Sequence, residues 1–319
     1  MQPILDAFRL PLVVTRYREL LMAFVRRELK ARIEGSMLGR VWPVVQPAVL
    51  FGIYYLVFAR LLKIGFREDL APHGPDGVGW RSTFYLITGI LPWTVLAESL
   101  SRGSGVVLEN ANLIKKIAFP SELLPLYTVI VNHVYFLIGY ALLLGLEFFV
   151  NGGLPMALVW FPAVLVTQFL FVSGLSMFLS AANIFVRDVM QLVPVAVTFW
   201  MFTTPVFYDL GAVEEKLTGD LIAAEAHLAA TPVSALEHPE ALRVRDEAQA
   251  AAGDMRRVNT IMEYNPMATA LELHRSIFTY GKVPFDTGKL MRFGLIALAV
   301  QILGYAFFLR CKGRFSDEV

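Results

Sequence analysis

The fold is decided by the stretch Asn110-Ala-Asn-Leu-Ile-Lys-Lys-Ile-Ala-Phe-Pro120, which joins two long apolar segments at about residues 83–100 and 123–150. The joining stretch is polar and carries two adjacent lysines, Lys115 and Lys116. Both flanking segments are near or above the roughly 20 apolar residues that a helix needs to cross a bilayer. Lysines between two spans must stay in water, and short basic loops favour the cytoplasmic side. We therefore predict a short cytoplasmic loop that docks a soluble protein.

The composition of the whole chain agrees with a membrane protein. Of its 319 residues, 56% are hydrophobic and 17% are charged, whereas soluble domains have about 45–50% apolar and about 25% charged residues. A net charge of +1 excludes a strongly basic nucleic-acid binder. The single cysteine, Cys311, excludes an internal disulfide.

The apolar segments predict an all-α integral membrane protein, because lipid offers no hydrogen-bond partner to an open strand edge. Six transmembrane helices are expected, at about residues 41–62, 83–100, 123–150, 154–184, 189–208 and 291–309. Basic residues gather in the N-terminal segment, in the second and fourth loops and after the last span. This bias predicts a multi-pass protein of the plasma (inner) membrane with both termini in the cytoplasm.

The segment before the first span is amphipathic over residues 5–34. Apolar residues recur there at helical spacing, and basic residues such as Arg26 and Arg27 fall on the other side. A basic amphipathic helix of this kind lies in the membrane interface. It serves either as a positive-inside anchor or, as we favour, as a collar that also meets a partner.

The loop at residues 209–289 is expected on the outer side. It contains an Ala/Glu-rich part at about 213–257, where helical spacing predicts short surface helices. Further on, Asn265-Pro266 is typical of a helix N-cap followed by proline at the first helical position. The helix that follows is predicted to end near Gly281 and is too short to span, so we expect it to lie at the outer interface or dip into it.

No motif for catalysis or nucleotide binding occurs in the sequence. There is no phosphate-binding Gly-x-x-x-x-Gly-Lys-Ser/Thr loop, no zinc-protease motif and no nucleophile elbow. His133 in the third span is expected to be a helix-packing residue. Glu98 and Glu147 lie near predicted helix ends, where snorkelling to the interface is expected.

Aromatic residues are the positive chemical signal in the spans. Tyrosine and tryptophan at the two interfaces form ordinary membrane belts, but Tyr54 and Tyr55 lie well inside the first span. A buried tyrosine hydroxyl needs a hydrogen-bond partner, either a neighbouring helix or a polar cargo. Packing between helices and a sugar-conducting lining both remain open on this pattern alone.

Four motifs, in order and at their spacing, resemble the membrane subunit of type-2 ABC exporters that move O-antigen, teichoic acid or capsule. They are Glu28-Leu-Lys-Ala-Arg-Ile-Glu-Gly-Ser-Met-Leu-Gly-Arg-Val-Trp-Pro43, Asn110 to Pro120, Ile184-Phe-Val-Arg-Asp188 and Tyr264-Asn-Pro-Met267. The resemblance covers nearly the whole chain. The Ala/Glu-rich part at 213–257 departs from it, since the family usually has a shorter outward loop.

The resemblance implies a homodimer bound to two copies of a separate ATPase subunit. ATP and Mg would bind that subunit and no cofactor would bind this chain, which would be a transport subunit rather than an enzyme. The loop at 102–120 and the N-terminal helix would dock into the ATPase through Arg26, Arg27, Asn110, Asn112, Leu113, Lys115, Lys116 and Phe119. A channel for a lipid-linked polysaccharide would be lined by Trp42, Tyr54, Tyr55, Phe58, Phe199 and Trp200. An outer gate would be formed by Pro205, Tyr208, Asn265 and Pro266.

Two other functions are weighed against this one. The chain could export a drug, lipid or other small amphiphile. It could also be a membrane-embedded enzyme of polymer assembly, which would need a polar site at the outer face. The polar candidates there form no recognised motif; they are Asp209, Glu263, Glu272, His274 and Arg275.

Overall fold

A computed structural model describes residues 9–34, 38–61, 78–116, 119–230, 238–278 and 285–318 of the chain. Within these residues all regular secondary structure is helical. Five helical segments are long and apolar enough to cross a membrane: Gly39–Phe58, Thr83–Glu109, Leu123–Val150, Met156–Phe185 and Thr287–Lys312. The all-α class is therefore confirmed, and five of the six predicted spans have a helix of sufficient length.

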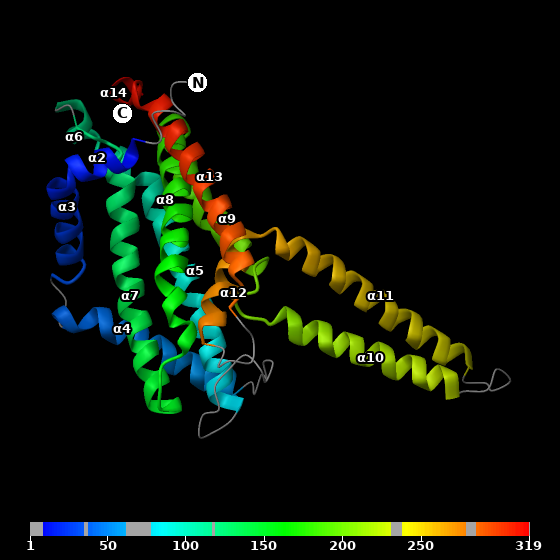
Figure 1. Cartoon of the computed structure of the whole chain (residues 1–319). Helices are drawn as coiled ribbons and strands as arrows, with labels where there is room; N and C mark the ends of the chain where they lie inside the picture. Colours follow the sequence, from blue (N-terminus) through cyan, green and yellow to red (C-terminus); the bar gives the residue numbers. More distant parts are fainter. Residues whose placement is uncertain are drawn as a thin grey trace.

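The central bundle is built from four of these segments (Figure 1). They are α5 (Val78–Glu109), α7 (Leu123–Asn151), α8 (Phe161–Phe185) with the preceding η4 (Met156–Trp160), and α13 (Thr287–Lys312). The predicted boundaries of the third and fourth spans agree with the observed ones within a few residues. At 32 residues α5 is longer than predicted, because its polar last turns continue as helix beyond the apolar segment.

The N-terminal segment contains two helices rather than one. α2 (Leu10–Arg16) and α3 (Arg18–Ala31) are separated at Tyr17, which leaves helical geometry at φ −109° and ψ 23°. α2 covers the end of the bundle, whereas α3 turns to run beside α7 (Figure 1). The break lets Leu21, Phe24 and Val25 of α3 become buried. The part of the predicted helix before residue 9 lies outside the described residues.

The first span is the least enclosed part of the bundle. It consists of η1 (Gly39–Val41), α4 (Trp42–Tyr54) and the π-helix η2 (Tyr55–Leu61). α4 runs obliquely across α7 and α5 (Figure 1). Only 11% of this segment is buried within the single chain. Its apolar surface is therefore left for lipid or for another protein chain.

The predicted fifth span is a shorter helix. α9 (Val189–Phe202) has 14 residues, about 21 Å at a rise of about 1.5 Å per residue, which is less than the hydrocarbon thickness. The chain turns at Thr203 instead of continuing to residue 208. α12 (Pro266–Ile277) begins near the C-terminal end of α9 and packs against α5, α8 and α13. α12 is mostly buried, so this short helix is part of the bundle and not a surface element; Gly281, its predicted end, lies outside the described residues.

The closest helix contact joins α8 and α13 through glycine. A Cβ atom added to Gly174 would lie 2.6 Å from the backbone nitrogen of Gln301, and one added to Gly304 would lie 2.0 Å from the carbonyl oxygen of Gly174. Small residues of this kind let two membrane helices approach backbone to backbone. The contact fixes α13 against the bundle.

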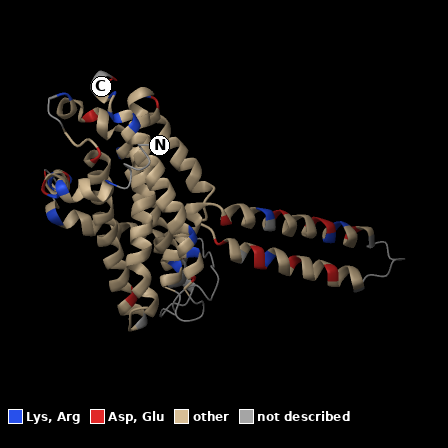
Figure 2. Ribbon diagram, turned by 45° about the horizontal axis from the view of Figure 1, so that its top comes forward, with Lys and Arg blue, Asp and Glu red and all other residues tan. Residues whose placement is uncertain are grey.

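The predicted insertion forms a long helical hairpin instead of short helices. α10 (Leu210–Ala230) and α11 (His238–Glu263) pack side by side and extend away from the bundle (Figure 1). Ala224, Ala241 and Ala252 are buried in the hairpin, because small side chains let the two helices approach closely. Charged residues recur along both helices of the hairpin, whereas the long helices of the bundle are mostly uncharged (Figure 2).

Candidate functional site

The loop after α5 turns at Asn110. The Asn110 side chain donates a hydrogen bond to the Val106 carbonyl at 2.8 Å, and the backbone carbonyl of Asn110 accepts from the Leu113 backbone N–H at 2.9 Å. These bonds end α5 and start the six-residue helix α6 (Ala111–Lys116). Asn112 and Lys115 are exposed and Leu113 is half-buried. The Lys116 side chain lies outside the described part of the structure.

The other end of the loop packs on the N-terminal helix. The Phe119 ring meets Phe24 edge to face at 5.7 Å between centroids, and Phe24 stacks on Tyr127 of α7 at 5.5 Å. The Arg27 guanidinium lies 4.7 Å from the centroid of Phe24, and Arg26 is exposed beside it. The structure thus brings Arg27 and Phe119, two of the predicted coupling residues, onto one aromatic cluster.

An ion pair at this end of the bundle was missed by sequence reasoning. The Glu122 carboxylate, 5% exposed, lies 2.6 Å from Lys312 Nζ and links the start of α7 to the end of α13. A cavity of about 460 Å³ opens beside the pair and is also lined by Arg9, Arg16 and Phe119. The available signal was an acid two residues after Pro120, opposite a basic residue after the last span.

The predicted gate residues and one predicted channel residue meet at the C-terminal end of α9. Asn265 caps α12, because its Oδ1 accepts from the Met267 backbone at 3.1 Å. The same oxygen accepts from Trp200 Nε1 at 3.2 Å, and Asn265 Nδ2 donates to Thr204 Oγ1 at 3.0 Å. Pro266 occupies the first helical position of α12, as predicted. A single asparagine therefore joins α9 to α12.

The turn after α9 is held from the other side by a buried arginine. Arg275 of α12 donates to the Val206 carbonyl at 2.9 Å, and its guanidinium lies 3.7 Å from the ring centroid of Tyr85 in α5. A Cβ atom added to Gly89 would lie 2.6 Å from the Arg275 guanidinium, so α5 leaves room for it. The sequence suggested Arg275 only as a polar residue of the outer loop.

Two tyrosine hydroxyls add hydrogen bonds to the turn that follows α9, residues 203–208, which is called the gate turn after the gate predicted there. Tyr85 donates to the Tyr208 carbonyl at 3.1 Å, and Tyr208 donates to the Phe202 carbonyl at 3.3 Å. Partial burial raises the pKa of Tyr208 above its ordinary value, so its phenol keeps the proton that it donates. Pro205 is buried in the same turn.

The predicted channel residues occupy several places. Phe58 stacks on Phe207 of the gate turn at 6.4 Å, and Tyr54 lies 6.0 Å from Phe58. The Tyr55 hydroxyl accepts from Arg60 at 3.0 Å, which gives that tyrosine a partner within its own segment. Trp200 points into the bundle and meets Trp93 edge to face at 5.8 Å.

Phe199 instead belongs to an exposed apolar stripe on α9. Leu192, Val195, Phe199 and Phe202 follow one another at intervals of three and four residues and are each 62–71% exposed. Trp42 lies apart from this stripe, beside Arg32 and Tyr135.

The polar residues considered for an enzyme are only partly assembled. Asp209, Glu263, Glu272 and Arg275 line one cavity of about 320 Å³. His274 turns away, with Nε2 2.8 Å from Gln168 Oε1. Across the described residues, no three His, Cys, Asp or Glu side chains gather closely enough to hold a metal ion. Arg275 and Glu272 are already engaged, with the Val206 carbonyl and with Lys289 respectively.

Comparison with known proteins gives consistent matches. The family described as ABC-2 type transporter matches residues 19–218. The O-antigen export system permease protein RfbA of Myxococcus xanthus is 31% identical over 209 residues, which are 66% of this chain and 75% of that protein. Two proteins of the same name from Klebsiella pneumoniae are 25% and 23% identical over 301 and 300 residues, in both cases 94% of each chain.

Proposed function

This chain belongs to the ABC-2 type transporter family, and we propose that it is the membrane subunit of an exporter for an O-antigen-like polysaccharide. The observation that carries the proposal is similarity along the chain to permeases named for O-antigen export. Two of these relatives match over 94% of both chains. That extent favours a polysaccharide over a small amphiphile as the cargo. The cargo would be lipid-linked, as the sequence motifs implied.

The working unit is proposed to be a homodimer in the plasma (inner) membrane. The stripe at Leu192, Val195, Phe199 and Phe202 and the open surface of α4 have no cover within one chain. A helical stripe at spacings of three and four suits packing against another helix. A second copy placed there would enclose a path between the α4 and α9 helices of the two subunits, with aromatic side chains that can stack on sugars.

The energy is proposed to come from two copies of a separate ATPase subunit, which bind ATP and Mg on the cytoplasmic side. α2, α6 and α14 (Phe315–Glu318) lie at one end of the bundle (Figure 1), which supports placing both termini on that side. Lys115 on α6 is exposed for docking, and the Phe119–Phe24 contact joins the loop to α3. A push on α6 would therefore reach both α5 and α3.

The docking role is tested by reversing one charge. The full chain is purified with the ATPase encoded beside it, and ATP hydrolysis and complex formation are measured for Lys115→Glu. Arg243→Glu is the matched control, because its side chain is 74% exposed on the outward hairpin. Lys115→Glu should weaken assembly and lower hydrolysis, whereas Arg243→Glu should not. Equal behaviour of the two variants would refute docking at α6.

The cargo is tested in cells that lack their own export permease. The chain and its ATPase should restore surface polysaccharide, and Phe199→Ala should lower that amount while the complex still assembles. Restored resistance to small amphiphiles without surface polysaccharide would refute the proposed cargo.

A further inference from the structure

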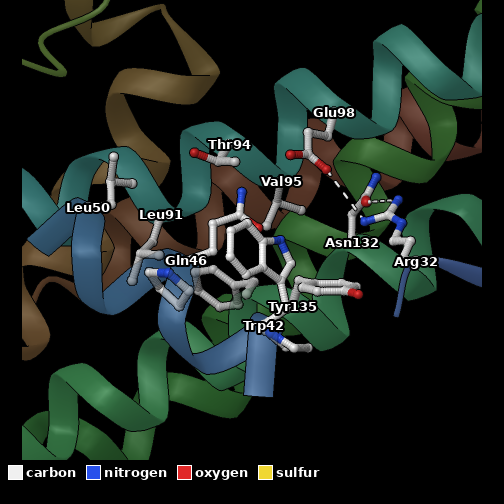
Figure 3. A pocket seen from close by; sticks show the side chains of 13 residues that line it. Arg32, Trp42, Gln46, Leu50, Leu91, Thr94, Val95, Glu98, Asn132 and Tyr135 are labelled. Carbon is white, nitrogen blue, oxygen red and sulfur yellow. Dashed lines mark hydrogen bonds and ion pairs between the residues drawn. The ribbon is translucent and has the colours of Figure 1, made fainter. Parts of the chain in front are cut away.

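A second polar cluster lies where α3, α4, α5 and α7 meet, far from the gate (Figure 3). Arg32 Nη2 donates to Asn132 Oδ1 at 2.9 Å, and Arg32 Nη1 lies 3.6 Å from Glu98 Oε2. Asn132 Nδ2 donates to Ser99 Oγ at 3.1 Å, which turns the amide oxygen toward Arg32. The cluster borders a cavity of about 280 Å³.

The cavity lies at the cytoplasmic boundary of the lipid. Glu98 lies two residues before the end of the apolar segment of α5 at about residue 100, where the predicted span meets the cytoplasmic side. Beyond Glu98 toward the α6 end, Arg102 lies 2.9 Å from Glu28 of α3. Charged pairs therefore mark the level of the lipid headgroups here.

The wall of the cavity changes character with depth. Its rim carries Arg32, Glu98 and Asn132, with Trp42 and Tyr135 beside them (Figure 3). The rest of its lining is mostly apolar, from Pro43, Pro47, Leu50, Leu91, Val95 and Phe136, with two uncharged polar side chains, Gln46 and Thr94, among them. Rim and lining together suit an amphiphile with a charged head and a hydrocarbon body.

The charged side chains at the rim do not use all of their hydrogen-bonding capacity on one another. At 3.6 Å, the contact between Arg32 and Glu98 is longer than a hydrogen bond. The Glu98 side chain is 45% exposed and that of Arg32 is 18% exposed. Arg32 Nε is buried without a hydrogen bond and has Glu28 Oε1 3.6 Å away as an ion-pair partner. The rim can thus accept a donor at Glu98 and offer donors at Arg32.

The charges at the rim determine which kind of lipid head group fits the cavity. Arg32 and Arg102 are matched by Glu28 and Glu98, so the rim has no net charge, and its most accessible carboxylate would repel a polyanionic head. A head with one phosphate and one ammonium group satisfies both signs. A cavity just below the about 300–1,000 Å³ of whole-ligand pockets holds such a head while the chains remain in the bilayer.

We propose that this boundary pocket binds one zwitterionic phospholipid of the cytoplasmic leaflet, with its phosphate on Arg32 and Asn132 and its primary ammonium on Glu98. The lipid fills the junction between α3 and the first span, so it also holds the N-terminal helices against α5 and α7. This inference does not depend on which cargo the exporter moves.

The test uses Trp42 as a reporter. The full chain is placed in vesicles of fixed composition, phosphatidylethanolamine and phosphatidylglycerol, in which only one of the two lipids carries bromine near the top of its chains. Bromine quenches tryptophan on contact, and subtraction of the Trp42→Phe signal isolates Trp42. Trp42 should be quenched by brominated phosphatidylethanolamine with about fivefold preference over brominated phosphatidylglycerol. One additional charge-assisted hydrogen bond of about 1 kcal/mol gives a factor of this size.

Two further arms separate the site from general packing. Glu98→Gln should remove most of the preference, whereas Glu109→Gln, an exposed acid farther along α5, should leave it unchanged. In the unaltered protein, brominated phosphatidylcholine should quench less than brominated phosphatidylethanolamine, because a trimethylammonium cannot donate a hydrogen bond to Glu98. Equal quenching by all lipids, or preference for phosphatidylglycerol, would overturn the proposal.

Discussion

Asn265 is the residue whose replacement most directly tests the joint between α9 and α12, where the sequence predicts an outer gate, because its side chain makes three kinds of contact at once. It caps α12 through Met267, accepts from Trp200 of α9 and donates to Thr204 in the turn that follows. Asn265→Ala removes all three contacts and leaves the Trp200 N–H without its acceptor. We expect α9 and α12 to separate more easily.

The size of the effect follows from these contacts. Loss of an N-cap costs about 1 kcal/mol. Each hydrogen bond contributes about 1 kcal/mol in soluble proteins, but polar pairs between membrane helices average about 0.6 kcal/mol. The free energy of unfolding should therefore fall by about 2–3 kcal/mol. Asn265→Asp keeps the oxygen that caps α12 and faces Trp200 and loses only the donor to Thr204, so it should cost about 1 kcal/mol or less.

The assay is equilibrium unfolding of the purified full chain in mixed micelles, followed by tryptophan fluorescence. Thr198→Ala is the matched control, since its hydroxyl is exposed and bonds only to the Pro194 carbonyl of its own helix. The expected order of stability is wild type and Thr198→Ala, then Asn265→Asp, then Asn265→Ala. If Asn265→Ala unfolds like Thr198→Ala, the asparagine does not join the two helices and the reasoning is wrong.

Two other substitutions probe the packing of the bundle. Gly174→Ala should destabilise the fold by about 1–3 kcal/mol, because the added Cβ would lie 2.6 Å from the Gln301 backbone. Gly145→Ala in α7 is the control: nothing lies within 4 Å of the added atom, so the substitution should be neutral or slightly stabilising. The same unfolding assay compares the two variants. Glu122→Gln should lower the free energy of unfolding by about 1–2 kcal/mol, a value kept small because the Lys312 side chain is 35% exposed. If a double-mutant cycle with Lys312→Met gives purely additive effects, the two side chains do not form a direct pair.

The helices of the bundle were predictable because lipid leaves few alternatives to a long apolar helix. α7 and α13 agree with their predicted ranges within a few residues. α9 was overestimated, because the apolar segment continues past Phe202 although the helix ends there. The helix ends there because Asn265, 61 residues further along the chain, bonds to Thr204 in the turn. No local sequence pattern reveals such a contact.

The site was predictable only where one residue carries a local signal. The N-cap at Asn265 is of this kind, and the structure places it as expected. The loop predicted at 102–120 begins later than expected, because residues 102–109 continue α5 as helix and the chain turns at Asn110. The partners of these residues were not predictable, since Trp200 was expected in the channel and instead donates to Asn265. Glu98 was expected to snorkel to the interface, but its pairing with Arg32, 66 positions before it, was not predictable.

Helix α5 relates the three regions to one another. Its ends carry Tyr85, which supports the gate turn, and the turn at Asn110, and Glu98 lies between them. Near its middle, α5 is tied to α8, because Gln168 Nε2 donates to the Pro92 carbonyl at 3.0 Å.

The same Gln168 side chain bonds His274 of α12 through its oxygen, so α5, α8 and α12 are joined into one body. One side of α9 packs against this body, with Val193 and Val197 buried and with Asn265 and Thr204 joining its C-terminal end to α12, and its other side presents the exposed stripe. A push on α6 would move α5 and, with it, α8 and α12. In the proposed exporter, a path beside α9 would widen when α9 shifts against this body, and the bonds of Asn265 to Trp200 and Thr204 would be among those that such a shift breaks.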